Sequence, residues 1–242
     1  MRDNIELGAI NEFEQASRPV LFRVKNSEYP YWGKGSSLFV ASDQNVYWLT
    51  ARHVIETQGA SAQDLMITPS DDSAITVPFT ELMQIVKDPE NQDYRDLYML
   101  KINLEEFWES TNSELRAWNI NQNFFDCDKL SDGDEIFIQG FPSESRFVDY
   151  AVKRIHLTKV VLRGIYEGRS SEAHCHKLRL ETSITLNDLD GLSGGTVFRH
   201  PRNPEEPTQL VGLLIRGSSK SGIVHFIDCA VIDKFVRLSD AA

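Results

Sequence analysis

The sequence has few cysteines, no long apolar run and fewer basic than acidic residues. Its 242 residues include three cysteines (Cys127, Cys175 and Cys229), too few for a disulfide framework, so a hydrophobic core must hold the fold. No apolar stretch approaches the roughly 20 residues that span a bilayer, so we expect no membrane partner. The 25 Lys and Arg against 36 Asp and Glu leave a net charge of −11, which argues against a nucleic-acid partner, because such binding needs cations that neutralise phosphates.

The amino-terminal sequence lacks the marks of an export signal. MRDNIELGAINEFEQ is polar and acidic, without an apolar core or a small-residue cleavage site. Together with the few cysteines, this predicts a cytoplasmic location with reduced thiols. Asp3 and Glu6 are spaced like a capping box, and nearby apolar residues recur with a period near 3.6. We therefore expect an amino-terminal helical segment over residues 1–18, ended by Pro19.

Short β-type runs separated by Gly, Pro, Asn and Asp dominate the rest of the chain. Many short strands of this kind predict an all-β sandwich or barrel, and the length suits one large β domain or two small barrels. The stretch 103–118 is polar with helical apolar spacing, which predicts a linker helix, and an apolar stripe predicts a helix at the carboxyl end. The expected strands are 20–24, 36–41, 45–50, 96–102, 134–141, 149–164, 176–183, 195–199, 209–217 and 222–228.

Three segments contain residues suited to catalysis. A predicted strand runs directly into His53, Asp96 precedes an apolar strand, and Ser193 lies among glycines. Acyl transfer needs these three types: a nucleophile, a base titrating near neutrality, and an anion that orients the base. The glycines let the N–H groups of Gly191 and Ser193 converge as an oxyanion hole. Singly, each segment also fits a structural His, a turn Asp or a flexible loop.

As a set, these motifs resemble the chymotrypsin/trypsin-fold serine peptidases, in the order His, Asp, Ser. L-T-A-x-H ends at His53, D-L begins at Asp96, and G-x-S-G-G surrounds Ser193, with Thr196 where Pro is usual. The spacings of 43 residues from His53 to Asp96 and 97 from Asp96 to Ser193 also agree with that family. The resemblance extends over residues 19–238.

The resemblance implies both a fold and a mechanism. The fold is all-β, with two antiparallel six-stranded barrels: the first over 19–108, and the second, with the linker helix and the carboxyl-terminal helix, over 109–242. The function implied is a serine endopeptidase acting on a protein or peptide substrate, with no metal and no cofactor. His53 would be the general base, Asp96 would fix its tautomer, and Ser193 would be the nucleophile.

Several positions depart from the family pattern. Leu192 replaces the Asp that pairs with a newly cut amino terminus in secreted trypsins, so activation of that kind is not available. Ile215 replaces a Ser that orients the catalytic Asp in many relatives, and Arg216 replaces an aromatic residue in the wall of the substrate cleft. These changes lead to the hypothesis that the enzyme is latent until a protein partner or assembly reshapes the cleft.

The specificity residues are less clear from sequence. Asn187 lies six residues before Ser193, flanked by Asp188 and Asp190. These acids could favour a basic residue before the scissile bond, or they could belong to a solvated loop. The candidate substrate-binding residues are Asn187, Asp190, Ile215, Arg216 and Gly217.

Other interpretations remain open at this stage. A pseudo-peptidase, or scaffold, would bind a peptide or partner in the same cleft without turnover. A plain structural β-barrel would make the triad spacing a coincidence. His174 and His176 share one face of a predicted strand, but a zinc site needs four ligands, so we expect no metal there. Cys175, between them, has no neighbouring base motif that would make it a nucleophile.

Overall fold

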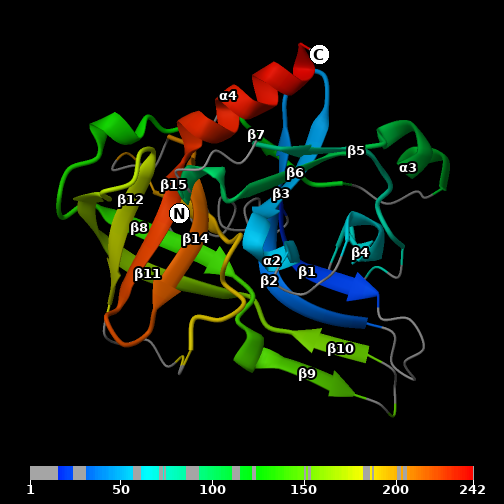
Figure 1. Ribbon diagram of the computed structural model, residues 1–242, viewed down its shortest axis with the longest axis horizontal. Coiled ribbons are helices and arrows are strands. Elements are labelled where there is room, and N and C mark those ends of the chain that lie inside the picture. The colour runs from blue at the N-terminus through cyan, green and yellow to red at the C-terminus, as the bar shows by residue number, and fades with distance from the viewer. Residues whose placement is uncertain are drawn as a thin grey trace.

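The computed structural model describes residues 16–23, 31–56, 61–70, 73, 75–85, 93–110, 115–121, 124–149, 151, 154–181, 186, 188–200, 203 and 206–241. Most of the predicted amino-terminal helix, residues 1–15, lies outside the described residues. The last two residues of the predicted segment are already in a strand, which begins at Ser17. The described chain is mainly β, as the sequence predicted (Figure 1).

The amino-terminal half forms a curled antiparallel sheet with the order β4-β1-β2-β3-β6-β5, and β7 pairs in parallel with β2. The prediction of a closed six-stranded barrel here is wrong for the described residues, because β4 has only two residues and does not pair with β5. The strands are β1 (Ser17–Arg23), β2 (Tyr31–Ala41), β3 (Val46–Ala51), β4 (Leu65–Met66), β5 (Phe79–Gln84), β6 (Leu97–Ile102) and β7 (Trp118–Asn119).

The carboxyl-terminal half forms a closed barrel with the order β11-β12-β15-β14-β13-β8, in agreement with the predicted second barrel. Every neighbouring pair is antiparallel, and apolar residues that alternate along the strands fill the interior. The strands are β8 (Glu135–Gly140), β11 (Val160–Arg169), β12 (Cys175–Leu180), β13 (Thr196–Arg199), β14 (Gln209–Ser218) and β15 (Ile223–Asp228). One closed barrel beside a half-barrel is compatible with a chymotrypsin-like fold.

The run 149–164, predicted as one strand, is divided in the structure. Its first part belongs to a separate two-stranded sheet of β9 (Arg146–Asp149) and β10 (Arg154–Leu157), and its last part begins β11. The Asp149 side chain accepts a hydrogen bond from the N–H of Ala151 (2.9 Å), a local turn that competes with a continuous strand. The hairpin β9–β10 lies below β1 and β2 in Figure 1.

The helices are short. They are α2 (Arg52–Glu56), α3 (Leu104–Ser110) and α4 (Cys229–Asp240), with single 3-10 turns at η1 (Ala62–Asp64), η2 (Asp93–Arg95), η3 (Cys127–Lys129) and η4 (Ser143–Ser145). Of the predicted linker helix, residues 104–110 are helical and the described residues 115–118 are not, while the predicted carboxyl-terminal helix is present as α4. In the part of the chain that the structure describes, no helix is long and apolar enough to cross a membrane.

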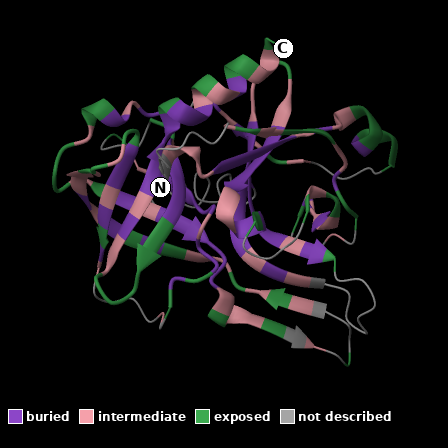
Figure 2. Cartoon of the chain, viewed as in Figure 1, coloured by how far each residue is buried: buried purple, intermediate pink, exposed green. Residues whose placement is uncertain are grey.

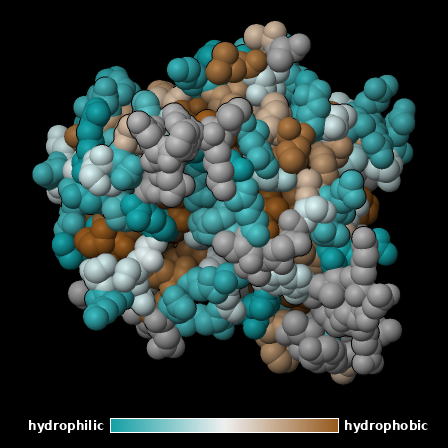
Figure 3. Space-filling view, in the orientation of Figure 1, coloured by the Kyte–Doolittle hydropathy of each residue, from teal (hydrophilic) through white to brown (hydrophobic). Residues whose placement is uncertain are grey.

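The sheet and the barrel share a buried interface. Apolar residues on the outside of the barrel and on α4 belong to the same buried cluster as those of β2, β3 and β6, and Figure 2 shows buried residues concentrated in these strands. Helix α4 starts at the end of β15 and extends across both units (Figure 1). Its Asp240 carboxylate accepts hydrogen bonds from Asn45 and Tyr47 of the first sheet, both at 2.7 Å. The face in Figure 3 carries both hydrophilic and hydrophobic described residues.

Candidate active site

His53 and Asp96 meet because two adjacent strands end beside each other. β3 leads directly into α2, whose second residue is His53, and β6 begins directly after Asp96. β3 and β6 are antiparallel neighbours with Ala51 opposite Leu97, so the end of one lies next to the start of the other. The fully buried core of both strands fixes this junction.

One carboxylate binds His53 at two points. Asp96 Oδ1 accepts from the backbone N–H of His53 (2.8 Å), and Asp96 Oδ2 lies 2.6 Å from His53 Nδ1. With Nδ1–H donating to the carboxylate, Nε2 is left as the basic nitrogen. The His53 side chain is 41% exposed and that of Asp96 23%, so the ring is open to a ligand while its partner is more enclosed.

Ser193 lies in a tight loop that needs glycine on both sides. Gly191 and Gly194 have φ of +90° and +84°, the left-handed region that residues with a Cβ rarely adopt. A Cβ at Gly191 would lie 2.5 Å from the Phe141 carbonyl oxygen, and one at Gly194 would overlap the Ser36 carbonyl oxygen. Beyond Ser193, the Gly194 N–H donates to the Leu214 carbonyl (2.7 Å), which ties the loop to β14.

Ser36 ties the serine loop to the first sheet. Its backbone N–H donates to the Ser193 carbonyl, and its hydroxyl donates to the Gly191 carbonyl, both at 2.8 Å. The Ser36 carbonyl in turn accepts from the hydroxyl of Thr50 (2.7 Å), three residues before His53. Ser36 and Thr50 are both fully buried. Ser36 therefore joins the serine loop to Thr50 of β3, the strand that leads into His53.

The backbone donors of the loop are available. Within the described ranges, no hydrogen bond is recorded for the N–H of Gly191 or for that of Ser193, although the neighbouring N–H groups of Leu192, Gly194 and Gly195 all donate. An oxyanion hole requires backbone N–H groups that are free to donate, here those of Gly191 and of Ser193 itself. The Ser193 hydroxyl donates to the Ile215 carbonyl (3.1 Å) in this conformation.

The predicted substrate-binding residues are only partly brought together. Ile215 contacts Ser193 through its carbonyl, while its side chain is buried between the two units. Arg216 and Gly217 follow on the exposed end of β14. Asp190 forms a 3.2 Å ion pair with Lys34 of the first sheet, so its carboxylate already has a partner in the other half of the molecule. Asn187 lies outside the described residues.

The cysteines do not offer a competing nucleophile. All three are buried free thiols. Burial raises the pKa of the Cys127 thiol to about 12 and that of Cys229 well above its ordinary range, so these groups stay protonated at neutral pH.

The two histidines around Cys175 have a structural role. His174 Nδ1 lies 3.3 Å from an Asp228 carboxylate oxygen, and buried His176 lies 2.7 Å from the Tyr166 hydroxyl and 3.7 Å from Asp228. Asp228 caps the start of α4 by accepting from the Val231 N–H (3.0 Å). Among the described residues no group of three potential ligands could hold a metal ion.

Sequence motifs identified His53, Asp96 and Ser193, but they assigned no role to Ser36 or Thr50 in joining the halves. They also left Lys34, Ser143 and Arg146 unnoticed, which line a pocket beside Gly191. No local pattern marks these residues, because their significance arises from contacts between distant segments. The chain matches no protein-family model, and the comparison with curated proteins finds no match either.

Proposed function

We propose that this chain is a serine endopeptidase that hydrolyses peptide bonds through an acyl-enzyme intermediate. The observation that carries the proposal is the double contact of Asp96 with His53, at the backbone N–H and at Nδ1. A turn or surface Asp does not need both contacts, whereas a residue that must hold one imidazole tautomer does. The unused N–H groups beside Ser193 support the same chemistry.

In the proposed reaction, Ser193 Oγ attacks the carbonyl carbon of the scissile bond while His53 Nε2 takes the hydroxyl proton. The carbonyl oxygen becomes an oxyanion that accepts from the N–H groups of Gly191 and Ser193. His53 then gives its proton to the leaving nitrogen as the C–N bond breaks, which leaves an ester on Ser193. Water, deprotonated by His53, attacks this ester and releases the acid.

Before the attack, the Ser193 hydroxyl must leave the Ile215 carbonyl and donate to His53. A bound substrate that interacts more strongly with the exchanged arrangement would favour it. The proposed place of action is the cytoplasm, which is supported by the three free thiols.

A second candidate is a scaffold that binds a peptide in the same cleft without turnover. The Ser193–Ile215 hydrogen bond favours it, because a hydroxyl held by a carbonyl is not activated. The two candidates differ in one measurable property, the reactivity of Ser193.

Labelling with a fluorophosphonate probe tests the proposal, because reaction with it needs nucleophile, base and oxyanion hole together. We expect the wild-type chain to be labelled at Ser193 and Ser193→Ala to be unlabelled. Ser221→Ala, which removes an exposed hydroxyl at a turn, is the matched control and keeps full labelling. A wild-type chain that neither labels nor hydrolyses any peptide would leave the scaffold as the function.

A further inference from the structure

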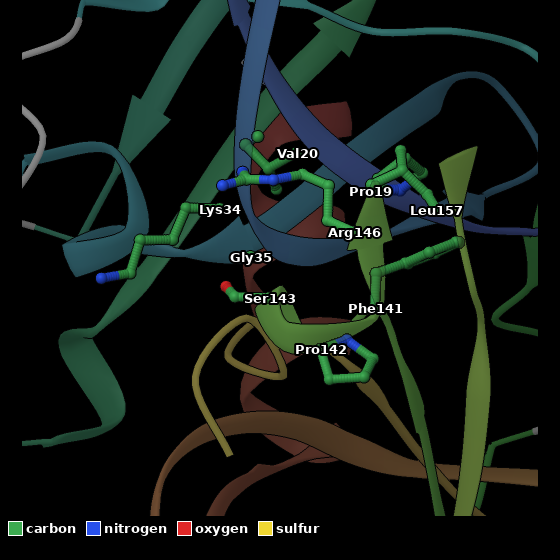
Figure 4. A pocket seen from close by; sticks show the side chains of 10 residues that line it. Pro19, Val20, Lys34, Gly35, Phe141, Pro142, Ser143, Arg146 and Leu157 are labelled. Carbon is green, nitrogen blue, oxygen red and sulfur yellow. The ribbon is translucent and has the colours of Figure 1, made fainter. Parts of the chain in front are cut away.

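A small pocket lies beside the candidate oxyanion hole, at the junction of three separate segments. β1 and β2 form one wall, the segment Phe141–Ser143 after β8 forms the second, and the hairpin β9–β10 contributes Arg146 and Leu157 (Figure 4). Its empty volume of about 210 Å³ includes space that is open to solvent, and the enclosed part holds about one water molecule. It is therefore a shallow site, with room for a small polar group that enters from the open side and none for a cofactor.

Two polar groups that line this pocket have no recorded hydrogen-bond partner among the described residues. Arg146 Nη1 and the Ser143 hydroxyl are buried atoms without a recorded hydrogen bond among the described residues, and no ion pair to Arg146 is recorded there either. In Figure 4 the Arg146 side chain extends past Val20 toward Lys34, and Ser143 lies below them, next to Gly35. Buried polar groups are nearly always hydrogen-bonded to protein, water or ligand, so these two groups are the donors that a polar ligand entering here would meet.

The charge around the pocket sets the sign of that ligand. Lys34 lines it, and the Lys159 ammonium lies 5.4 Å from the centre of the Phe141 ring, which forms part of its wall. Two acids lie close by: Asp190 is paired with Lys34 at 3.2 Å, and Glu144 follows Ser143 in η4. Against these, Arg146, Lys34 and Lys159 leave a small local excess of positive charge in a chain with a net charge of −11, which favours an anion. Arginine binds a planar carboxylate through two parallel hydrogen bonds, and Ser143 can donate a third.

The pocket shares a wall with the proposed catalytic loop. A Cβ at Gly191 would lie 2.6 Å from the Ser143 backbone nitrogen, and that nitrogen donates to the Asp190 carbonyl (2.7 Å). Ser193 contacts β14 on one side, through Ile215, and the segments that form the pocket on the other. If the acyl part of a substrate follows the exposed end of β14, the residues after the scissile bond point toward the pocket.

We propose that this pocket binds a carboxylate of the peptide segment that follows the scissile bond, held by Arg146 and Ser143 with Lys34 on the rim. The carboxylate comes either from an acidic side chain or from the carboxyl terminus of a short substrate. The position relative to the scissile bond rests on the proposed peptidase function, whereas the binding of a carboxylate does not.

The direct test uses the full chain carrying Ser193→Ala, which cannot turn over a peptide. Three peptides serve as probes: Ala-Asp-Ala amide, Ala-Asn-Ala amide, and Ala-Ala with a free carboxylate. We expect nuclear magnetic resonance titration to show that at least one acidic probe binds about 10- to 100-fold more tightly than the Asn peptide. The Asp amide and the free dipeptide separate the two sources of the carboxylate.

Substitutions then assign the binding to the pocket. Arg146→Gln should abolish the preference for the acidic probe, Arg146→Lys should retain part of it, and Ser143→Ala should weaken it less than Arg146→Gln. Arg169→Gln, at the exposed end of β11, is the matched control and leaves all three affinities unchanged. Thermal unfolding of each variant identifies any that fails to fold, in which case the remaining pocket variants decide. Equal affinities for the three probes, or a preference that survives Arg146→Gln, would overturn the proposal.

The two proposals fail separately. A chain that is not labelled by the fluorophosphonate but binds acidic probes through Arg146 retains the carboxylate site and loses the peptidase function. A chain that is labelled but does not discriminate between Asp and Asn keeps the peptidase function and loses the carboxylate site.

Discussion

At the scale of single residues, Asp96 contacts His53 at two points. The backbone contact at 2.8 Å positions the first turn of α2, and the side-chain contact at 2.6 Å leaves Nε2 as the basic nitrogen when the ring proton is on Nδ1. Gly191 and Gly194 are needed for their positive φ and because backbone atoms of other segments leave no room for a Cβ.

If His53, Asp96 and Ser193 act as one unit, each alanine substitution should lower kcat/KM by several orders of magnitude. Double substitutions should cost little more, because the remaining groups cannot work without the missing one. The measurement is steady-state hydrolysis of a chromogenic peptide, with circular dichroism to show that each variant is folded. If the activation free energy lost in a double variant equals the sum of the losses in the two single variants, the three residues do not act as a triad.

At the scale of secondary structure elements, α4 connects the two halves. Asp228 caps its first turn, and Asp240 at its last turn accepts hydrogen bonds from the first sheet. Burial by itself raises the pKa of Asp228, but the hydrogen bonds from His176 and from the Val231 N–H lower it below its ordinary value. The charged form of Asp228 is therefore the one that stabilises the fold.

We expect Asp228→Ala to lower the free energy of unfolding by about 1–2 kcal/mol at neutral pH, since it removes a helix cap and its histidine contacts. Because the pKa in the folded state is lowered, the stabilisation is full above the ordinary value of 3.8 and is lost as pH falls through the folded value. Urea unfolding at several pH values measures this, and the difference in free energy of unfolding between wild type and variant should decrease in acid.

Asp233→Ala is the control for this prediction, because it removes an acid from the same helix. Its carboxylate pairs with Arg237 on the surface (2.9 Å), and exposed pairs contribute little. If the loss of unfolding free energy in Asp228→Ala stays constant down to acid pH, the charge of Asp228 is not what stabilises α4.

At the scale of the whole molecule, the candidate site forms where a half-barrel meets a closed barrel. If the proposed function and location are correct, the enzyme needs restraint, and the family resemblance implies that Leu192 does not allow activation by a cut amino terminus. Ile215 lacks a hydroxyl that could orient Asp96, and the charged Arg216 follows it on the exposed end of β14. Suppose that one molecule in a hundred has the competent site. A partner that binds the competent state more favourably by about 3 kcal/mol would then make that state the more populated one.

The latency hypothesis predicts that the isolated chain reacts slowly with active-site probes and that Arg216→Gly accelerates this reaction. The physical reason is that a long charged side chain beside the Ile215 carbonyl hinders entry to the cleft. Stopped-flow labelling measures the rate, and Ser218→Gly on the same strand end is the control that should leave it unchanged. If the purified chain cleaves unfolded casein at rates typical of trypsin, the latency hypothesis is wrong.

Strands with buried faces were the easiest part of the fold to predict. β3, β6, β8 and β15 have continuous or alternating apolar residues, and each falls within about a residue of its predicted range. The sequence did not predict β5, because its three apolar residues do not alternate with polar ones and most of its residues are exposed, so it carries no core-facing pattern. It is a strand because it pairs with the edge of β6 that β3 does not occupy.

The sequence alone determined the residue types able to perform acyl transfer and the presence of α4, because short motifs and the period of a helix are local properties. The tertiary structure decided that the first sheet stays open among the described residues and that Ser36 joins Ser193 to Thr50. It also decided that Arg146 shares a pocket with Lys34. The contacts of Ser36 with Ser193 and of Arg146 with the pocket of Lys34 join segments more than a hundred residues apart, and no local pattern of side chains specifies which distant segments will meet.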